Sequence, residues 1–233
     1  MATIKSFFGL DMNAFDFSNL AFGDFYDGSS TFFEVYYDTG YADLFSGFGF
    51  SYAGNEPVSG TVTSYAFAMW SPSSAIIAQI TGIAVPMVDI VAAANTATLT
   101  DDALVFAAHL NGRDTLIGSP YQERFAGFGG NDRLTGGGDA DSFVYLGNDG
   151  KDKITDFSPF ENDRIDLGLM DANDNRGGNQ KFKFIGSKHF ADKAGQLRFA
   201  NHKLQGDTDG DGRAELVIKL PGLSDLEKGD IYL

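Results

Sequence analysis

Four acidic residues recur every nine positions in the middle of this chain. From residue 109 to residue 144 the sequence reads HLNGRDTLI, GSPYQERFA, GFGGNDRLT and GGGDADSFV, with an acid in sixth place and a large apolar residue in eighth place of each unit. The acids are Asp114, Glu123, Asp132 and Asp141. Carboxylates beside backbone carbonyls provide the hard oxygen ligands that Ca²⁺ prefers. The spacing therefore predicts a calcium-binding repeat.

The remainder of each unit indicates how these acids are positioned. Glycines in the first, second and fourth places permit the positive-φ conformations of a tight turn, and the last three residues can form a short strand. With a period of nine the turns stack as a solenoid, with an apolar column inside formed by Leu116, Phe125, Leu134 and Phe143. Without a cation the stacked carboxylates repel, and four thin turns bury little apolar surface. We expect folding to depend on calcium.

The pattern resembles the RTX nonapeptide G-G-x-G-x-D-x-U-x, which forms a parallel β-roll with calcium between its turns. The third and fourth units fit well, whereas the first lacks the leading glycines and the second has Glu123 in the aspartate place. The resemblance implies that calcium bridges alternate turns on one side of the roll, which pairs Asp114 with Asp132 and Glu123 with Asp141. The implied ligand set is Asn111, Gly112, Asp114, Glu123, Gly129, Gly130, Asp132, Gly136, Gly138, Asp141, Asp149 and Asp152.

The resemblance continues to the end of the chain and so covers about half of it. Gly150, Asp152 and Ile154 restate the G-x-D-x-U core after a two-residue insertion. The segments KITDFSPFENDRIDL (153–167) and LQGDTDGDGRAELVI (204–218) are similar to the C-terminal domain of serralysin-type secreted proteins.

A second acidic motif lies near the C-terminus. Asp207, Asp209 and Asp211, followed by Gly212, match the opening of an EF-hand loop, but the twelfth place holds Ile218 instead of the bidentate Glu. Two interpretations remain. The segment is either a calcium loop completed by Glu215 or a hydrogen-bonded turn whose acids face water.

Other features agree with export by a type I ABC exporter. The ending Asp230-Ile231-Tyr232-Leu233 resembles the uncleaved signal that such exporters read in this family. The N-terminus has no sustained apolar stretch typical of a Sec signal, and the most apolar segment, 76–94, is interrupted by polar residues and Pro86. The chain has no cysteine and therefore no disulfides, so we expect calcium to stabilise the exported protein in their place. We expect a secreted protein, extracellular or at the cell surface.

Charge divides the chain into two predicted domains, 1–108 and 109–233. Residues 1–110 hold 11 acids against Lys5 alone, a net charge of −10, and the remainder holds 21 acids and 16 bases, a net charge of −5, which together give −15. Such a chain should not bind nucleic acid or insert into membranes. Calcium, the exporter, and either further copies of the chain or cell-surface polysaccharide are the expected partners.

The predicted fold class is mainly β. A small antiparallel β-domain with one or two short helices, rich in aromatic residues, should precede a C-terminal calcium-binding parallel β-roll closed by antiparallel strands. Composition and turn residues predict strands at 32–37, 47–52 and 61–70. They predict helices at 86–94 and at 101–109, the second beginning at a Thr100 cap and covering the open end of the roll.

Motifs of several enzyme classes are missing from the sequence. None of the three histidines is followed by Glu, as H-E-x-x-H requires, and there is no G-x-S-x-G, P-loop or dinucleotide-binding fingerprint. We therefore expect a non-catalytic structural or adhesive protein that assembles into a surface layer, filament or matrix. The alternative is an extracellular polysaccharide-binding or polysaccharide-modifying protein whose β-roll serves secretion and stability.

Overall fold

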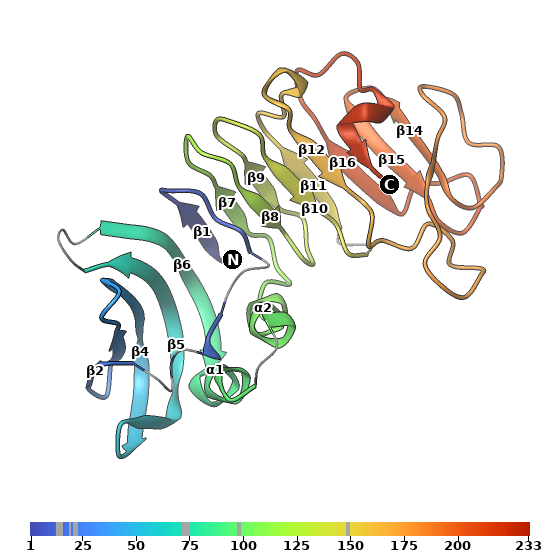
Figure 1. Ribbon diagram of the computed structural model, residues 1–233. Helices are drawn as coiled ribbons and strands as arrows, with labels where there is room; N and C mark the ends of the chain where they lie inside the picture. Colours follow the sequence, from blue (N-terminus) through green and yellow to red (C-terminus); the bar gives the residue numbers. More distant parts are fainter. Residues whose placement is uncertain (13–15, 19, 21–22, 71–74, 97–98, 148–149) are drawn as a thin grey trace. The chain divides into compact units, whose positions relative to one another are not determined.

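The chain is mainly β and divides into two compact units, Met1–Asn111 (unit 1) and Gly112–Leu233 (unit 2). The computed structural model describes residues 1–233 except 13–15, 19, 21–22, 71–74, 97–98 and 148–149 (Figure 1). The structure thus divides the chain after Asn111, three residues beyond the predicted boundary between residues 108 and 109. In the part of the chain that is described, no helix is long and apolar enough to cross a membrane.

Unit 1 is built on an antiparallel sheet with strand order β1-β6-β5-β4-β3-β2. The strands are β1 (Thr3–Ser6), β2 (Phe25–Gly28), β3 (Phe32–Tyr36), β4 (Tyr41–Ala53), β5 (Glu56–Met69) and β6 (Ala75–Pro86). Each of the three predicted strands corresponds to one of these. The strands β4 and β5 are longer than predicted, because glycine and serine pairs inside them do not end the ladder.

Two helices, α1 (Met87–Ala94) and α2 (Leu99–Ala107), cover the inner face of this sheet (Figure 1). Phe17 joins the layers, since its ring lies 6.2 Å from Phe45, 5.7 Å from Tyr65 and 5.6 Å from Phe106 of α2. Its amide also donates a hydrogen bond of 3.1 Å to the carboxylate of Asp102. Aromatic packing therefore holds unit 1 together.

One local prediction for unit 1 is wrong, and one strand of unit 1 is not predicted. The helix α2 begins at Leu99, so Thr100 lies inside it and is not its cap. The segment 75–86, for which no strand is predicted, forms β6, whose buried and more exposed residues largely alternate. Its apolar composition hides that alternation, and only Pro86 marks the change from strand to helix.

The chain of unit 2 passes back and forth between two sheets whose strands are paired in parallel. One sheet contains β7 (Thr115–Ile117), β9 (Arg133–Thr135), β11 (Lys151–Ile154) and β16 (Leu216–Lys219). The other contains β8 (Arg124–Ala126), β10 (Ser142–Val144), β12 (Arg164–Asp166) and β17 (Ile231–Tyr232). Consecutive strands from β7 to β12 thus alternate between the sheets, and each nine-residue unit forms half of one coil.

The strand register follows the repeat. Leu116 pairs with Leu134 and Phe125 with Phe143, each 18 residues apart. Leu134 pairs with Ile154, 20 residues on, as the predicted two-residue insertion requires. All four repeat residues are buried, but they form two facing columns instead of the predicted single one, because successive units lie in different sheets.

Antiparallel strands complete unit 2. The strands β14 (Gln196–Ala200) and β15 (Lys203–Asp207) extend the first sheet beyond β16 in antiparallel pairing, and β13 (Lys183–Phe184) pairs in parallel with β14. Two single turns of 3-10 helix, Pro159–Glu161 and Lys228–Asp230, precede β12 and β17.

Candidate metal centre

The turns of the repeat approach so closely that glycine is required in them. Gly130 has φ +135°, and a Cβ there would lie 1.6 Å from the carbonyl oxygen of Gly112. Gly150 has φ +106°, and its Cβ would lie 1.4 Å from the carbonyl oxygen of Gly130. The absence of side chains therefore stacks backbone carbonyls at one position per coil, beside the sixth-place acids.

Asp114, Asp132 and Asp152 form a first column of acids. The amide of Asp114 donates a hydrogen bond of 2.7 Å to Oδ1 of Asp132. The amide of Asp132 in turn donates one of 2.8 Å to Oδ1 of Asp152. Each carboxylate thus reaches back one full coil, and residues that are 18 or 20 positions apart become neighbours.

Glu123, Asp141 and Asp163 form a second column of the same design. The amide of Glu123 donates to Oδ1 of Asp141 at 2.9 Å, and the amide of Asp141 donates to Oδ1 of Asp163 at 3.0 Å. The six acids of the two columns are no more than 3% exposed. The two pairs implied by the repeat are therefore spatial neighbours, and each pair continues into a third acid.

Burial and the other two acids of the second column make ionisation of Asp141 unfavourable. Burial raises the pKa of Asp141 to about 8, and the nearby charges of Asp163 and Glu123 act in the same direction. Burial also raises the pKa of Asp163. The Oε2 atom of Glu123 is buried and has no hydrogen-bond partner. Among the described residues, no Lys, Arg or His forms an ion pair with these three acids. Buried carboxylates in this arrangement favour either protonation or a bound cation.

The other predicted ligands lie in or near the same turns. The amide of Gly136 donates to Asp156 at 3.0 Å, and that of Gly138 donates to the Ser119 carbonyl at 3.0 Å. Gly129 immediately precedes Gly130 in the third turn. The side-chain amide of Asn111 donates to the carbonyl of Ala108 in unit 1. Asp149 lies outside the described residues.

Two acids of the site are absent from the sequence-based set. Asp163 ends the second column, and Asp156 accepts hydrogen bonds from the amides of Gly136 and Gly137 at 3.0 and 2.9 Å. A signal for Asp163 exists, because Asn162-Asp163-Arg164-Ile165 restates Asn131-Asp132-Arg133-Leu134 of the third unit. The intervening insertion disguises it.

The acidic turn that follows β15 brings together three of the four carboxylates of the predicted calcium loop. Ligand atoms of Asp207, Asp209 and Glu215 lie within 4.8 Å of one another and could hold a metal ion. Asp211 instead forms a 4.0 Å ion pair with Arg213. Asp207 is fully buried, and its two oxygens accept hydrogen bonds from the amides of Gly210 and Gly212 at 2.6 and 3.0 Å. The hydrogen bonding of this turn is thus already extensive without a metal.

The two acidic regions differ in the ligands they would offer. The turn after β15 brings three carboxylates together, whereas each column carries one carboxylate per coil and would complete a site with backbone carbonyls. No protein-family model matches this chain, and comparison with curated proteins finds no match.

Proposed function

We propose that unit 2 is a calcium-binding β-roll of the RTX type, with Ca²⁺ held along the two acid columns. The observation that carries this proposal is the second column. Glu123, Asp141 and Asp163 are buried one above another, and Glu123 presents an oxygen that has no hydrogen-bond partner. A divalent cation would offset the charge that burial and mutual repulsion make unfavourable there.

The proposed ligands come from both side chains and backbone. The six column acids would supply anionic oxygens, and the carbonyls that face the glycines, such as those of Gly112 and Gly130, would complete the coordination. The turn containing Asp207, Asp209 and Glu215 is a separate candidate site for a metal ion. None of its three acids belongs to either column, so substitutions can test the two regions one at a time.

Circular dichroism with and without calcium tests this proposal. Unit 2 should be largely disordered in chelator and become β-rich at about 0.1 to 1 mM calcium, the range of extracellular modules. Trp70 is the only tryptophan and lies in unit 1, so its fluorescence reports on unit 1 separately. Far-UV spectra that are identical in chelator and in calcium would refute calcium-dependent folding.

The biological role that we propose is that of a secreted, non-catalytic structural or adhesive protein, exported by a type I system and folded by extracellular calcium. Exposed aromatic side chains on unit 1 support a role in association. Phe25 lies 5.8 Å from Tyr36, and Tyr36 lies 5.8 Å from Trp70, with Phe25 and Trp70 exposed by 59% and 44%. Apolar surface of this kind is common where proteins associate.

Self-association can be measured directly. Electron microscopy and analytical ultracentrifugation of the full chain, in calcium and in chelator, should show assemblies only with calcium. A double substitution, Phe25→Ser with Trp70→Ser, should reduce assembly without changing the calcium midpoint of folding. A protein that stays monomeric at high concentration in millimolar calcium would overturn the proposed structural role. It would not contradict the proposed calcium binding by unit 2.

A further inference from the structure

Unit 1 contains a cavity of about 530 Å³ on the inner face of its sheet. The base of the cavity is formed by β4, β5 and β6, which contribute Asp43, Tyr65, Phe67 and Ala78. The volume is in the range of small-molecule sites, about 300 to 1,000 Å³.

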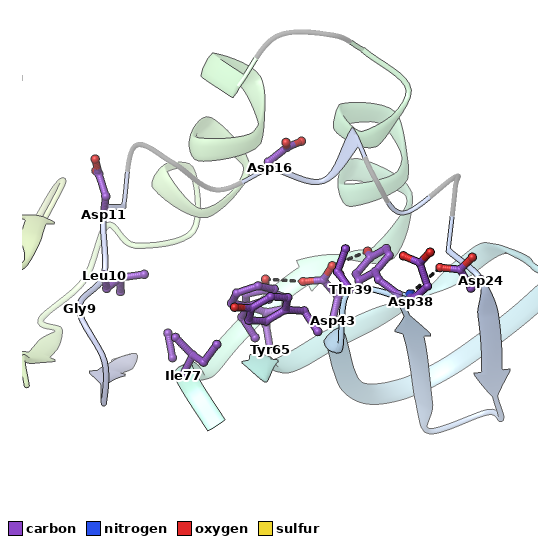
Figure 2. A pocket seen from close by; sticks show the side chains of 14 residues that line it. Gly9, Leu10, Asp11, Asp16, Asp24, Asp38, Thr39, Asp43, Tyr65 and Ile77 are labelled. Atoms are coloured by element: carbon purple, nitrogen blue, oxygen red, sulfur yellow. Dashed lines mark hydrogen bonds between the residues drawn. The ribbon is translucent and has the colours of Figure 1, made fainter. Parts of the chain in front are cut away.

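Five aspartates line this cavity, namely Asp11, Asp16, Asp24, Asp38 and Asp43. Figure 2 shows them spread along it, from Asp11 at one end to Asp24 at the other. Its described lining includes no Lys, Arg or His, and Lys5 is the only basic side chain of unit 1 other than His109. A cationic ligand would therefore meet attraction from several sides.

Asp43 is the deepest of these carboxylates and is only 4% exposed. The hydroxyls of Tyr37 and Tyr65 donate hydrogen bonds of 2.6 and 2.7 Å to its two oxygens, which fixes its orientation. Burial raises the pKa of Asp43 to about 6, and the charge of Asp16 acts in the same direction. At neutral pH the cavity thus holds a buried negative charge at a defined position.

Four aromatic rings, those of Tyr37, Tyr41, Tyr65 and Phe67, also line the cavity. Tyr41 and Phe67 stack with centroids 5.4 Å apart and an angle of 11° between the rings. Tyr37 and Tyr65 stand beside Asp43. Aromatic faces next to carboxylates attract ammonium groups through both cation–π and Coulomb interactions, whereas an anion gains nothing from either.

We propose that this cavity binds a small organic cation, an ammonium group on a short apolar body, with Asp43 as the buried counter-ion and the aromatic rings enclosing the carbon atoms. The ammonium could belong to a free amine or to a lysine side chain of a protein. The site is separate from the acid columns of unit 2 and does not depend on calcium binding there.

NMR titration of the full chain in calcium tests the proposal with three probes. Benzylammonium is the cationic probe, benzyl alcohol its neutral counterpart, and N-acetyl-lysine amide represents a protein side chain. Benzylammonium should shift the amide signals of cavity residues and bind at least about 10-fold more tightly than benzyl alcohol. Tighter binding of N-acetyl-lysine amide than of benzylammonium would identify a protein side chain as the source of the ammonium.

Two substitutions locate the binding. Asp43→Asn should weaken benzylammonium binding by about 10-fold, because the side chain keeps an acceptor for a tyrosine hydroxyl but loses its charge. Asp89→Asn, at an exposed position of α1 outside the cavity, removes the same charge and should leave the affinity unchanged. Thermal unfolding followed by Trp70 fluorescence shows whether both variants are folded.

Several results would overturn the proposal. Equal affinity for benzyl alcohol would show an apolar or sugar-type site, and equal weakening by Asp89→Asn would show only general electrostatic attraction. Benzylammonium affinity that falls steeply as the calcium concentration is raised at constant ionic strength would identify a divalent-cation site. No signal shifts with any of the probes would show that the cavity does not bind cations.

Discussion

Replacement of Asp141 by Asn is the sharpest test of the proposal that the acid columns bind calcium. Asp141 occupies the middle of the second column, where its carboxylate accepts the Glu123 amide at 2.9 Å and its own amide donates to Asp163. Asparagine keeps an oxygen acceptor of nearly the same shape but removes the charge. The substitution therefore separates hydrogen bonding between coils from the binding of a cation.

The size of the effect follows from burial. Asp141 is 2% exposed, so a charge-assisted interaction there is worth about 1.5 to 3 kcal/mol. At about 1.4 kcal/mol for each factor of ten, the calcium concentration at the folding midpoint should rise by about 10- to 100-fold. The Asp139→Asn variant is the matched control, because Asp139 lies in the same turn, is exposed and has φ +66°, which asparagine tolerates.

The assay is a calcium titration followed by far-UV circular dichroism at constant ionic strength and neutral pH. Asp139→Asn should titrate close to the wild type, within about 2-fold, since a surface charge contributes little. An Asp141→Asn midpoint equal to that of Asp139→Asn would show that the second column does not bind calcium. Folding of Asp141→Asn in chelator would show instead that repulsion in the column, relieved by the substitution, is what calcium overcomes.

Asp132→Ala should raise the calcium midpoint of folding more than Glu123→Ala does. The reason is that Asp132 accepts the amide of Asp114 in another coil, whereas Glu123 accepts the amide of Ser119 in its own turn at 3.1 Å. An equal or reversed order in the same titration would contradict this. Gly150→Ala should destabilise unit 2 by about 3 kcal/mol in denaturant unfolding with calcium, whereas Gly177→Ala, with no atom within 4 Å of its Cβ, should not. Phe143→Ala should cost about 3 to 5 kcal/mol in the same experiment and Phe160→Ala, at a 99% exposed position, almost nothing; equal effects would mean that the apolar columns are not the core. Finally, the pKa of Asp43 rises from 3.8 to about 6 on folding, so the folded protein binds this proton more tightly than the unfolded chain. The free energy of unfolding of unit 1 should therefore fall by about 3 kcal/mol as pH rises from about 4 to above 6, and this fall in Trp70-detected stability should be absent in Asp43→Asn.

The repeat in unit 2 could be predicted because a solenoid converts sequence period into spatial distance. Residues 18 positions apart are neighbours when two nine-residue units complete one coil, and the resemblance to the RTX repeat, in which alternate turns share a side, implied the pairing of Asp114 with Asp132. The period alone does not show that Leu116 and Phe125 belong to different sheets. Asp163 was missed because an insertion of irregular length interrupts the period before it.

Unit 1 offers no comparable rule. Its cavity combines Asp16 and Asp24 with Asp43 on β4 and Phe67 on β5, and their approach depends on how residues before β2 pack against the three strands β4, β5 and β6. Strand composition predicted part of the sheet, but β6 was hidden in an apolar segment that also contains the start of α1. Acidic and aromatic residues alternate along much of the first half of unit 1, so nothing in the local sequence marks Asp43 as the buried acid.

The two units have cores of different kinds, and this bears on where calcium acts. In unit 1 the rings of Phe17, Phe45, Tyr65 and Phe106 pack together as an aromatic core. In the repeat of unit 2, each three-residue strand buries only one or two apolar side chains for each buried carboxylate. Because burial of an apolar side chain contributes about 1.5 to 3 kcal/mol and an uncompensated buried carboxylate costs several, the charge state of the columns decides whether the repeat is stable. Calcium would then control the folding of unit 2.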